Sequence, residues 1–455
     1  GRRSPTTTGN RDATVNSSPR TNGPVDIVGP GPEEKARLQS DRLTTLVRRL
    51  AEGPNEAWRE KLADVDPETI TSIVDIGRLP FTTKQDLRDT YPLGMVTVPI
   101  DEVVRLHASS GTSGKPTIVA YTRADLALWA ECNARALALA GVKAGDILHN
   151  SYGYGLFTGG LGLHYGGERL GAAVVPVSGG NSSLQLQLLE DLGARAICAT
   201  PSFSLLLAER AAAAGLLDRL NVEVGILGAE PWSEGMRTRI ESAWGGGFRA
   251  LDIYGLSEVI GPGVAMESPD DLGALQLFDD HFFAEIVDPE TGDPLPDGHW
   301  GELVVTTLTK EAMPLLRYRT GDITRILEGP GPPGRNWIRI ARITGRADDM
   351  LIIRGINVYP REIEAVLLED PDLSGQYAIV VDRRATMTEL RVRAESDPRA
   401  ADRTGKVGSR LEAALLARVR VRVRVEVVHP GSMARTEAGK VQRVFEQTDD
   451  RDPLG

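Results

Sequence analysis

The sequence contains only two cysteines, Cys132 and Cys198, in a chain of 455 residues. Cys132 lies in a stretch with a helical pattern and Cys198 in an apolar, strand-like stretch, so we interpret both as buried thiols. Two such thiols suit a reducing compartment. We therefore expect a cytoplasmic protein.

Long apolar runs and an excess of basic residues are missing as well. No uninterrupted apolar run approaches the roughly 18 residues of a membrane helix, which argues against a membrane span or a membrane partner. The formal net charge of −11 argues against a general nucleic-acid-binding surface. A site for an anionic ligand must therefore be built locally, from a few residues.

The chain is longer than a usual single domain, and its composition divides it into four parts. Residues 1–33 are rich in Gly, Pro, Ser, Thr, Asn and Arg and lack apolar periodicity. This composition predicts a disordered leader without the apolar core of a secretory signal. We expect a large domain over residues 34–347, a smaller domain over residues 348–446 and a tail over residues 447–455.

Short apolar strands alternate with helical stretches between Ala108 and Leu327, which predicts an α/β sheet that is at least partly parallel and flanked by helices. Residues from Trp300 onward in this region indicate a smaller, more antiparallel piece, and Asp349 begins a compact α+β unit. Thr82 or Thr83 is expected to cap a helix. The predicted strands are residues 194–199, 222–227, 251–254, 300–308, 322–327, 350–353, 377–382 and 389–394, and the predicted helices are residues 42–62, 125–140, 184–192, 202–214, 233–244, 360–368 and 407–417.

The segment Val419–Val427, VRVRVRVEV, alternates strictly and predicts a half-buried strand. Arg420, Arg422 and Arg424 would share one face of that strand. They form either a solvated edge or a basic patch near a phosphorylated thiol cofactor, and the pattern leaves both interpretations open.

The segment Ser109–Thr117, SSGTSGKPT, gathers hydroxyl groups, glycines and one lysine in a single loop. Hydroxyls, exposed N–H groups and a cation are what a polyphosphate requires of a loop that it approaches closely. A Walker A motif is excluded, because that pattern requires Gly at the position of Ser109 and Ser or Thr at the position of Pro116. A flexible turn is the alternative. The candidate phosphate-binding residues are Ser109, Ser110, Gly111, Thr112, Ser113, Gly114 and Lys115.

Five other motifs follow this loop along the chain: GAEPWS from Gly228, DIYGLSEVIGPG from Asp252, YRTGDI from Tyr318, ITGRADDMLIIRGINVYPREIE from Ile343 and GKVQR from Gly439. Together with SSGTSGKPT they resemble the adenylate-forming superfamily of acyl- and aryl-CoA synthetases and firefly luciferase-like enzymes. From about Arg42 to the C-terminus, the chain looks most like the phenylacetate–CoA ligases. The resemblance implies a large N-terminal α/β adenylate-forming domain and a small mobile C-terminal α+β domain.

The resemblance also implies an ATP-dependent ligase that joins a carboxylate to the α-phosphate of ATP and releases pyrophosphate. Repulsion between the anions and a charged transition state require cations, so Mg²⁺ is expected with ATP, and Glu258 is similar to the family's Mg²⁺ ligand. Lys440 matches the catalytic lysine that bridges the carboxylate and the α-phosphate. Asp348 matches the hinge at which the small domain turns between the two reactions.

The same resemblance assigns nucleotide contacts to residues in several motifs. Tyr254 is expected to stack on the adenine, and Asp322 to accept hydrogen bonds from both ribose hydroxyls, which suits a carboxylate with two oxygens. Ser257 is expected near the α-phosphate, and Arg346 matches an arginine that contacts the nucleotide. Without the resemblance, Asp322 would be interpreted as a turn residue, and Glu258 and Lys440 as surface residues. The other expected contacts are Gly228, Ala229, Glu230 and Pro231 along the adenine, together with Asp252 and Gly255.

The segment Tyr152–Gly160, YGYGLFTGG, places aromatic side chains among glycines. Such a flat, apolar slot suits an aryl acid better than a long fatty chain, although burial in an ordinary core is the alternative. No acidic residue is placed to recognise an α-amino group, so amino-acid activation is disfavoured. The expected acid-pocket residues are Tyr154, Phe157, Ile260, Gly261 and Pro262.

Two departures from the family's pattern concern substrate and metal. Where the family often carries Val-Pro-Phe-Tyr, this chain has AEGPNEAWRE at Ala51–Glu60. Where it often carries cysteines, this chain has Met266–Ser268 and GPGPPGR at Gly329–Arg335. Since Pro and Gly side chains cannot bind a metal, no structural zinc is expected. The departures also support the hypothesis of a specialised biosynthetic aryl acid.

The acyl acceptor, the ring substituents and the oligomeric state are left open. CoA is the expected acceptor, because a full C-terminal domain favours thioester formation. The alternative is an aryl-AMP ligase that passes its acyl group to a carrier protein, an amine or a second aryl acid. A non-catalytic nucleotide-binding relative is disfavoured by the presence of Lys440, Glu258 and Asp322. Phenylacetate and hydroxy- or aminobenzoates are the candidate acids, and a homodimer is the candidate oligomeric state.

Overall fold

The computed structural model describes residues 24–109, 116–230, 232–347, 351–353, 356–384, 388–435 and 441–454. Its helices are α1 (Pro32–Glu52), α2 (Glu56–Lys61), α3 (Lys84–Asp89), α4 (Arg123–Leu139), α5 (Gly159–Leu170), α6 (Ser182–Leu192), α7 (Pro201–Ala213), α8 (Glu234–Trp244), α9 (Pro360–Glu369) and α10 (Thr404–Val419).

The strands are β1 (Arg105–Ala108), β2 (Ile118–Tyr121), β3 (Ile147–Asn150), β4 (Ala173–Val175), β5 (Ala196–Ala199), β6 (Val224–Gly228), β7 (Arg249–Leu256), β8 (Gly261–Ser268), β9 (Asp271–Leu277), β10 (Phe282–Val287), β11 (Gly301–Thr307), β12 (Tyr318–Thr324), β13 (Ile338–Ala341), β14 (Gly345–Arg346), β15 (Leu351–Ile353), β16 (Ile356–Val358), β17 (Leu373–Asp382), β18 (Glu389–Ser396), β19 (Val423–Val428) and β20 (Val444–Gln447).

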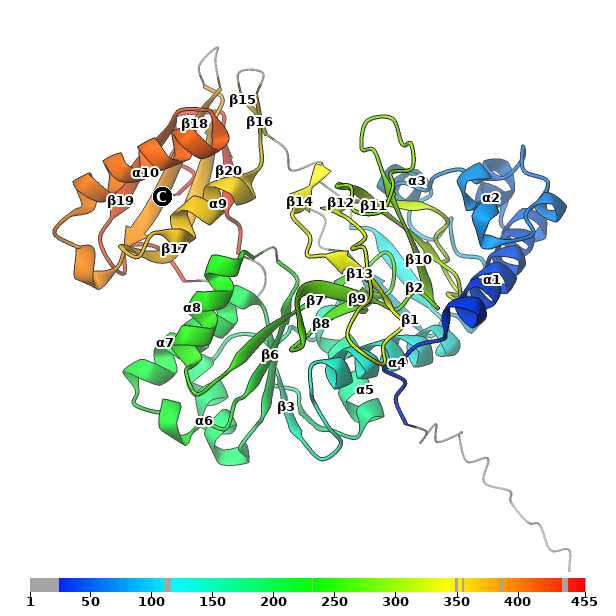
Figure 1. Cartoon of the computed structure of the whole chain (residues 1–455), viewed down its shortest axis with the longest axis horizontal. Helices are drawn as coiled ribbons and strands as arrows, with labels where there is room; N and C mark the ends of the chain where they lie inside the picture. The colour runs from blue at the N-terminus through cyan, green and yellow to red at the C-terminus, as the bar shows by residue number, and fades with distance from the viewer. Residues whose placement is uncertain are drawn as a thin grey trace, which may run out of the picture.

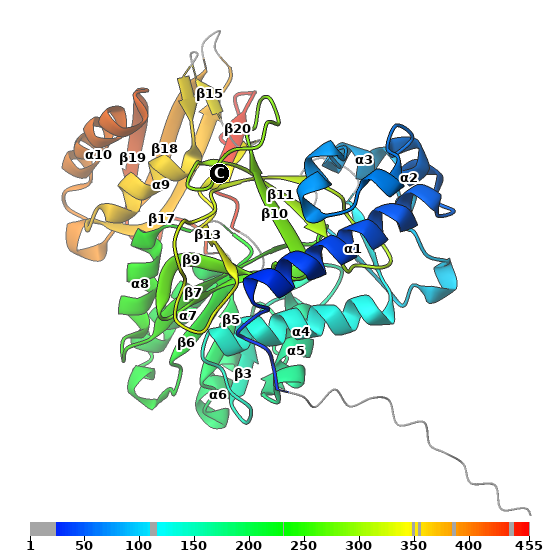
Figure 2. The same ribbon diagram turned by 45° about the vertical axis from the view of Figure 1, so that its right-hand side comes forward.

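The largest sheet is mixed and has the strand order β13-β9-β8-β7-β6-β5-β3-β4. Strands β4, β3, β5, β6 and β7 pair in parallel, whereas β7, β8, β9 and β13 pair antiparallel. Ala196 and Cys198 of β5 belong to one apolar cluster, and Ile197 and Ala199 to a second. Both faces of the sheet are therefore covered, which confirms the predicted partly parallel sheet flanked by helices. Helices α4 and α5 pack against each other beside it (Figures 1 and 2).

A second sheet has the order β10-β11-β12-β14 and is antiparallel throughout. The smaller antiparallel piece expected after Trp300 is thus confirmed. Strand β12 begins at Tyr318, earlier than the predicted start at Asp322, and ends at Thr324 rather than at Leu327. The segment YRTGDIT pairs with β11 although it contains Gly and Asp, because every second residue of it is buried.

The C-terminal part contains a sheet of order β19-β18-β17-β20 with α9 and α10, as expected for an α+β unit (Figure 1). The predicted strand Val419–Val427 is wrong in its first half. Helix α10 continues to Val419, Arg420 ends it in the left-handed conformation at φ +57°, and β19 begins only at Val423. The alternation of buried Val and exposed Arg residues persists through this turn.

The two parts of the chain meet along α8 and α9, which lie next to each other in Figure 1. A Cβ atom on Gly235 of α8 would lie 3.1 Å from the Leu368 side chain of α9, so the helices approach closely. Met236 and Leu367 belong to the same apolar cluster. The Arg239 guanidinium of α8 also donates to the carbonyl oxygen of Leu373 at 2.8 Å.

Several smaller expectations have clear outcomes. Thr83 caps α3 and exchanges hydrogen bonds with Asp86, which decides between the two alternatives, Thr82 and Thr83, in favour of Thr83. The helical stretch expected over residues 42–62 is divided at Gly53 into α1 and α2. Both cysteines are buried and unpaired, and burial raises the pKa of each thiol. Within the described ranges, no helix is long and apolar enough to cross a membrane.

Helix α1 lies against the large domain near α4 and above it in the view of Figure 2. It begins at Pro32, two residues inside the expected leader. Lys35 binds the Asp279 carboxylate at 2.8 Å, and the Gln39 amide donates to the Asp279 carbonyl oxygen at 2.7 Å. The helix is therefore tied to the connection between β9 and β10.

Candidate active site

The predicted phosphate loop connects the two strands of the β1–β2 hairpin. Its base is closed by a hydrogen bond from the Ser109 amide to the Thr117 carbonyl oxygen at 2.9 Å. The hydroxyls of Ser109 and Thr117 are buried and have no hydrogen-bond partner among the described residues. Unsatisfied buried hydroxyls at the base of a loop fit an anionic ligand. Ser110, Gly111, Thr112, Ser113, Gly114 and Lys115 lie outside the described residues.

The expected adenine-lining stretch begins where β6 ends. A Cβ atom on Gly228 would lie 2.5 Å from the Ile253 carbonyl oxygen, so only glycine fits there. Ala229 follows, directly after the end of β6, with φ +71°. The Glu230 carboxylate accepts from the Ser202 amide at 2.7 Å and from the Val441 amide at 3.2 Å. Pro231 lies outside the described residues.

Glu230 therefore joins the large domain to the C-terminal segment. Val441 follows Lys440 directly in the sequence, and Lys440 itself lies outside the described residues, as does the expected hinge Asp348. The Arg443 guanidinium makes a second contact, to the Ser202 hydroxyl at 3.4 Å. Two segments about 200 residues apart in the chain thus meet beside the GAEPWS motif.

Tyr254, Asp322 and Arg346 form a connected group from three strands. The Tyr254 hydroxyl donates to one oxygen of Asp322 at 2.7 Å, and Arg346 donates to the other at 3.0 Å. Antiparallel pairing of β12 with β14 places Asp322 directly opposite Arg346. Burial, and then the neighbouring Asp322 carboxylate, raise the pKa of Tyr254 well above its ordinary value. The structure thus brings together three of the residues expected at the nucleotide.

Asp252 and Gly255 both belong to β7. The Asp252 carboxylate accepts from the Arg342 guanidinium at 2.9 Å, so this expected nucleotide contact already has a cationic partner. A Cβ atom on Gly255 would lie only 2.0 Å from the Gly261 carbonyl oxygen. Glycine is therefore required at this position for β7 and β8 to approach each other.

Glu258 lies in the turn between β7 and β8 and is buried. Its carboxylate lies 3.6 Å from the Lys84 ammonium and accepts no hydrogen bond from the other described side chains. A buried carboxylate with free lone pairs is the donor that Mg²⁺ prefers, so the residue fits the expected metal. Ser257 precedes it and exchanges a hydrogen bond with the Thr158 hydroxyl at 3.1 Å.

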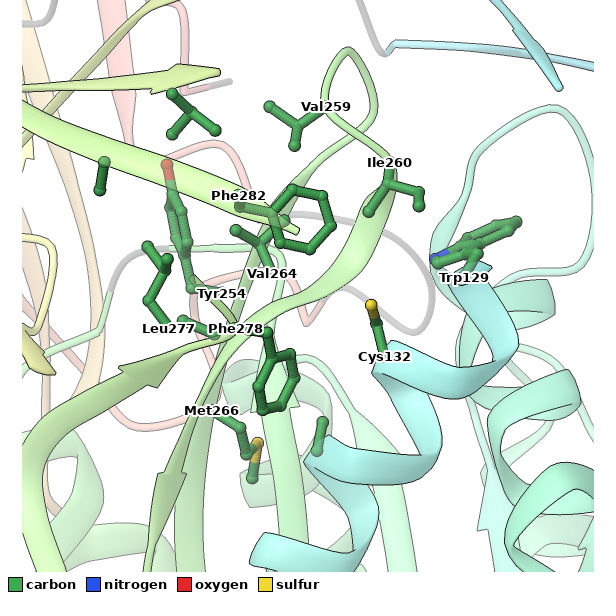
Figure 3. Close-up of a cluster of buried hydrophobic side chains, with 14 of the residues drawn as sticks. Trp129, Cys132, Tyr254, Val259, Ile260, Val264, Met266, Leu277, Phe278 and Phe282 are labelled. Carbon is green, nitrogen blue, oxygen red and sulfur yellow. The ribbon is translucent and has the colours of Figure 1, made fainter. Parts of the chain in front are cut away.

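The expected acid-pocket residues come from two segments. The Tyr154 hydroxyl contacts the Asn150 amide at 2.7 Å and the His164 ring at 3.2 Å, and Phe157 is 54% exposed. Ile260 is fully buried and lies in the apolar cluster of Figure 3, which also contains Trp129.

Trp129 supports the rest of that turn. Its indole N–H donates to the Pro262 carbonyl oxygen at 3.0 Å. Gly261 has φ +102°, and a Cβ atom there would lie 2.7 Å from the Trp129 ring. The turn therefore follows the surface of this indole closely, which only glycine permits.

Three further residues at the site are missed by the sequence analysis. Lys310 is buried and donates to the Glu258 carbonyl oxygen at 3.0 Å, and burial lowers its pKa to about 8. The Tyr121 hydroxyl donates to the Ile260 carbonyl oxygen at 3.0 Å. Tyr152 is buried against Gly159. Only Tyr152, inside YGYGLFTGG, has a signal in the sequence.

Comparison with known proteins agrees with this geometry. Residues 30–309 match the family described as AMP-binding enzyme, and residues 355–448 match the AMP-binding enzyme C-terminal domain. The chain belongs to the AMP-binding enzyme family. The phenylacetate-coenzyme A ligase of Thermus thermophilus is 46% identical over 91% of this chain and 97% of its own length. The Aromatoleum evansii ligase of the same name is 44% identical over 93% of this chain and 99% of its own length.

These findings confirm the resemblance to adenylate-forming enzymes and, within them, to phenylacetate–CoA ligases. Among solved structures, this AMP-binding enzyme is similar to 2-hydroxyisobutyryl-CoA ligase in its postadenylation state, with a TM-score of 0.85, 28% identity and coverage of 92% of this chain and 91% of that one. The same ligase in its thioesterification state gives a TM-score of 0.68 at 29% identity, with coverage of 93% and 92%. By TM-score, this chain is therefore more similar to the first of these two structures than to the second.

Proposed function

We propose that this AMP-binding enzyme activates phenylacetate, or an aryl acid of similar size, as its acyl-adenylate with release of pyrophosphate, and then forms the aryl-CoA thioester. The observation that carries the proposal is the 46% identity to a phenylacetate-coenzyme A ligase over 97% of that ligase. Identity of this extent spans both domains, so both reactions are expected.

In the first reaction, the large domain holds the nucleotide. Asp322, with one oxygen on Tyr254 and the other on Arg346, is fixed in position before ATP binds, which suits a carboxylate that receives the ribose hydroxyls. Ser109 and Thr117 supply hydroxyls at the base of the phosphate loop.

Charge is the main difficulty of this reaction, because two anions must meet. Glu258 is the proposed ligand of Mg²⁺, which would neutralise phosphate charge when bound. Lys440 is the proposed cation at the reacting oxygens. Its proposed role is supported by the contact of the adjacent Val441 amide with Glu230, which places the C-terminal segment beside the GAEPWS motif.

The aryl acid is proposed to bind between the YGYGLFTGG segment and the turn at Ile260–Pro262. The open backbone at Gly153 and Gly155, where an added Cβ would meet nothing within 4 Å, leaves room beside Tyr154. A substrate other than phenylacetate, selected by a biosynthetic pathway, remains the hypothesis raised by the sequence departures. A reducing, cytoplasmic location is proposed from the two buried, unpaired thiols.

The test is pyrophosphate release across phenylacetate, benzoate, hydroxybenzoates and aminobenzoates, with and without CoA and with and without Mg²⁺. We expect release with phenylacetate that requires Mg²⁺, and an aryl-CoA product identified by mass. No release with any acid would refute the proposal. Release that CoA does not alter, without a thioester, would instead identify an aryl-AMP ligase that uses another acceptor.

A further inference from the structure

Lys310 is a buried lysine that belongs to none of the motifs discussed above. It is 1% exposed and lies in the connection that follows β11. Its ammonium donates to the Glu258 carbonyl oxygen at 3.0 Å and lies 5.2 Å from the centre of the Tyr121 ring. Burial of an ammonium group destabilises a fold unless strong contacts compensate for it, so the position of this charge requires an explanation.

The main chain around Lys310 is held independently of its side chain. The Asp125 carboxylate accepts from the amides of Glu311 at 2.6 Å and Ala312 at 2.9 Å. The Arg49 guanidinium donates to the Lys310 carbonyl oxygen at 2.8 Å. The loop therefore presents the Lys310 side chain from a fixed support.

The turn that Lys310 contacts carries groups for both substrates. Glu258 precedes Ile260 by two positions, and both lie between β7 and β8. Gly261 and Pro262, the other proposed acid-pocket residues of this turn, are the first residues of β8. The Tyr121 hydroxyl donates to the Ile260 carbonyl oxygen, so Lys310 and Tyr121 hold two carbonyls of one short turn. Figure 3 shows Val259 and Ile260 of this turn within the apolar cluster that anchors it.

We propose that Lys310 is a positioning residue for acid activation. By holding the main chain of Glu258, it fixes the proposed metal ligand Glu258 and the proposed acid-binding residues Ile260–Pro262 in position relative to each other. This inference rests on the proposed function. A donor that fixes a turn in this way matters through geometry, because a displacement of about 1 Å at a reacting group costs on the order of 100-fold in rate.

The experiment compares Lys310→Met, which removes the donor and the charge at nearly constant volume, with Lys310→Gln, which keeps a shorter donor. Lys35→Met is the matched control, since Lys35 also contacts a carbonyl oxygen, that of Asn336 at 2.6 Å, but at the N-terminal helix. The assays measure pyrophosphate release with phenylacetate as Mg²⁺ and acid concentrations vary. Amide hydrogen exchange of residues 256–262, without any ligand, provides a readout independent of activity.

For Lys310→Met we expect at least about a tenfold fall in kcat, at least about a threefold rise in the Mg²⁺ concentration for half-maximal rate and in the KM for phenylacetate, and faster exchange of the turn. Lys310→Gln should show smaller changes in the same direction. Lys35→Met should match the wild type in all four quantities.

Three results would overturn the inference. One is a folded Lys310→Met protein with wild-type kinetics and exchange. Another is a fall in kcat alone, with unchanged half-saturation, because that pattern reports a loss of active protein. The third is the failure of both variants to fold, which would assign Lys310 to stability. Failure of the proposed function itself would be seen separately, as the absence of pyrophosphate release by the wild-type protein.

Discussion

The proposed nucleotide site has two sides, and the hydrogen bonds that hold them differ in length. On the large domain, Tyr254, Asp322 and Arg346 are joined by hydrogen bonds of 2.7 and 3.0 Å. On the C-terminal side, the contacts that reach the GAEPWS region are longer, at 3.2 Å from Val441 and 3.4 Å from Arg443. These longer bonds lie at the weak end of the usual range.

This difference fits different roles for the large domain and for the C-terminal segment. The hydrogen-bonded group of Tyr254, Asp322 and Arg346 suits a nucleotide that must stay bound through two reactions. A C-terminal segment held by longer hydrogen bonds, at Val441 and Arg443, suits a group that is needed in one reaction and must leave before the next. Substitutions on the two sides should therefore affect the two reactions differently.

The largest expected effect comes from Lys440→Ala, at the residue that precedes Val441 in the sequence. Because the lysine is proposed to meet the charge that develops at the α-phosphate, pyrophosphate release should fall at least about 100-fold. Formation of the thioester from supplied phenylacetyl-AMP and CoA should stay near the wild-type rate. Both reactions are followed by mass spectrometry of the aryl products. Equal losses in the two reactions would show that the two sides are not separable in this way.

Asp322→Asn should impair both reactions, since the proposed site holds AMP in both of them. The loss of a charged acceptor for the ribose is expected to raise the KM for ATP about tenfold and to weaken use of supplied phenylacetyl-AMP similarly. Asp271→Asn is the control, because Asp271 pairs with Arg339 at 3.3 Å at the edge of the large sheet. An unchanged KM for ATP would remove Asp322 from the site.

Arg239→Ala tests the contact between α8 of the large domain and the C-terminal part. Arg239 binds the Leu373 carbonyl oxygen, and a Cβ atom on Gly375 would lie 3.0 Å from its guanidinium. Loss of this bond should weaken the present arrangement and lower pyrophosphate release about threefold, without lowering thioester formation. Arg195→Ala is the matched control, since Arg195 donates to the Gly141 carbonyl oxygen at 2.9 Å within the large domain. A similar loss in both variants would indicate a general effect on folding.

The sequence predicts well those features that depend on local patterns. The strands β5, β6 and β7 and the helices between them follow from local apolar patterns. The family motifs point to Tyr254 and Asp322, which the structure brings into contact, and their roles at the nucleotide stay predictions. Lys310 and Tyr121 escape prediction because their roles arise from contacts with residues far away in the chain. No local pattern distinguishes TLTK from an ordinary loop lysine.

The wrong start of the predicted strand Val419–Val427 has a local cause. The segment VRVRVRVEV was predicted as one strand, but its first valine completes the apolar face of α10, where a period of 3.6 residues applies. The left-handed Arg420 then changes direction before β19 begins. A strict alternation of two residue types cannot show where a helix ends, because buried and exposed positions also alternate in the turn.

The smallest expected effect on activity is that of Asp279→Asn, which addresses the stability of the large domain. Burial raises the pKa of Asp279 to about 6 from an ordinary value of 3.8, although Lys35 partly opposes this rise. Between these two pH values the folded state binds more protons than the unfolded state, so this group lowers the free energy of unfolding as the pH rises through that range.

Compared at pH 4 and pH 7 by urea unfolding, the wild type should therefore lose about 2–3 kcal/mol more than Asp279→Asn. Lys35→Met should deepen the loss and extend it to higher pH, because the carboxylate then ionises without its cation at 2.8 Å. The ratio of the two reaction rates should be the same in all three proteins, since Asp279 binds α1 within the large domain and takes no part in the contacts at Val441 and Arg443. A changed ratio would mean that the large domain and the small domain are coupled through α1, and the contrast between the two sides would fail.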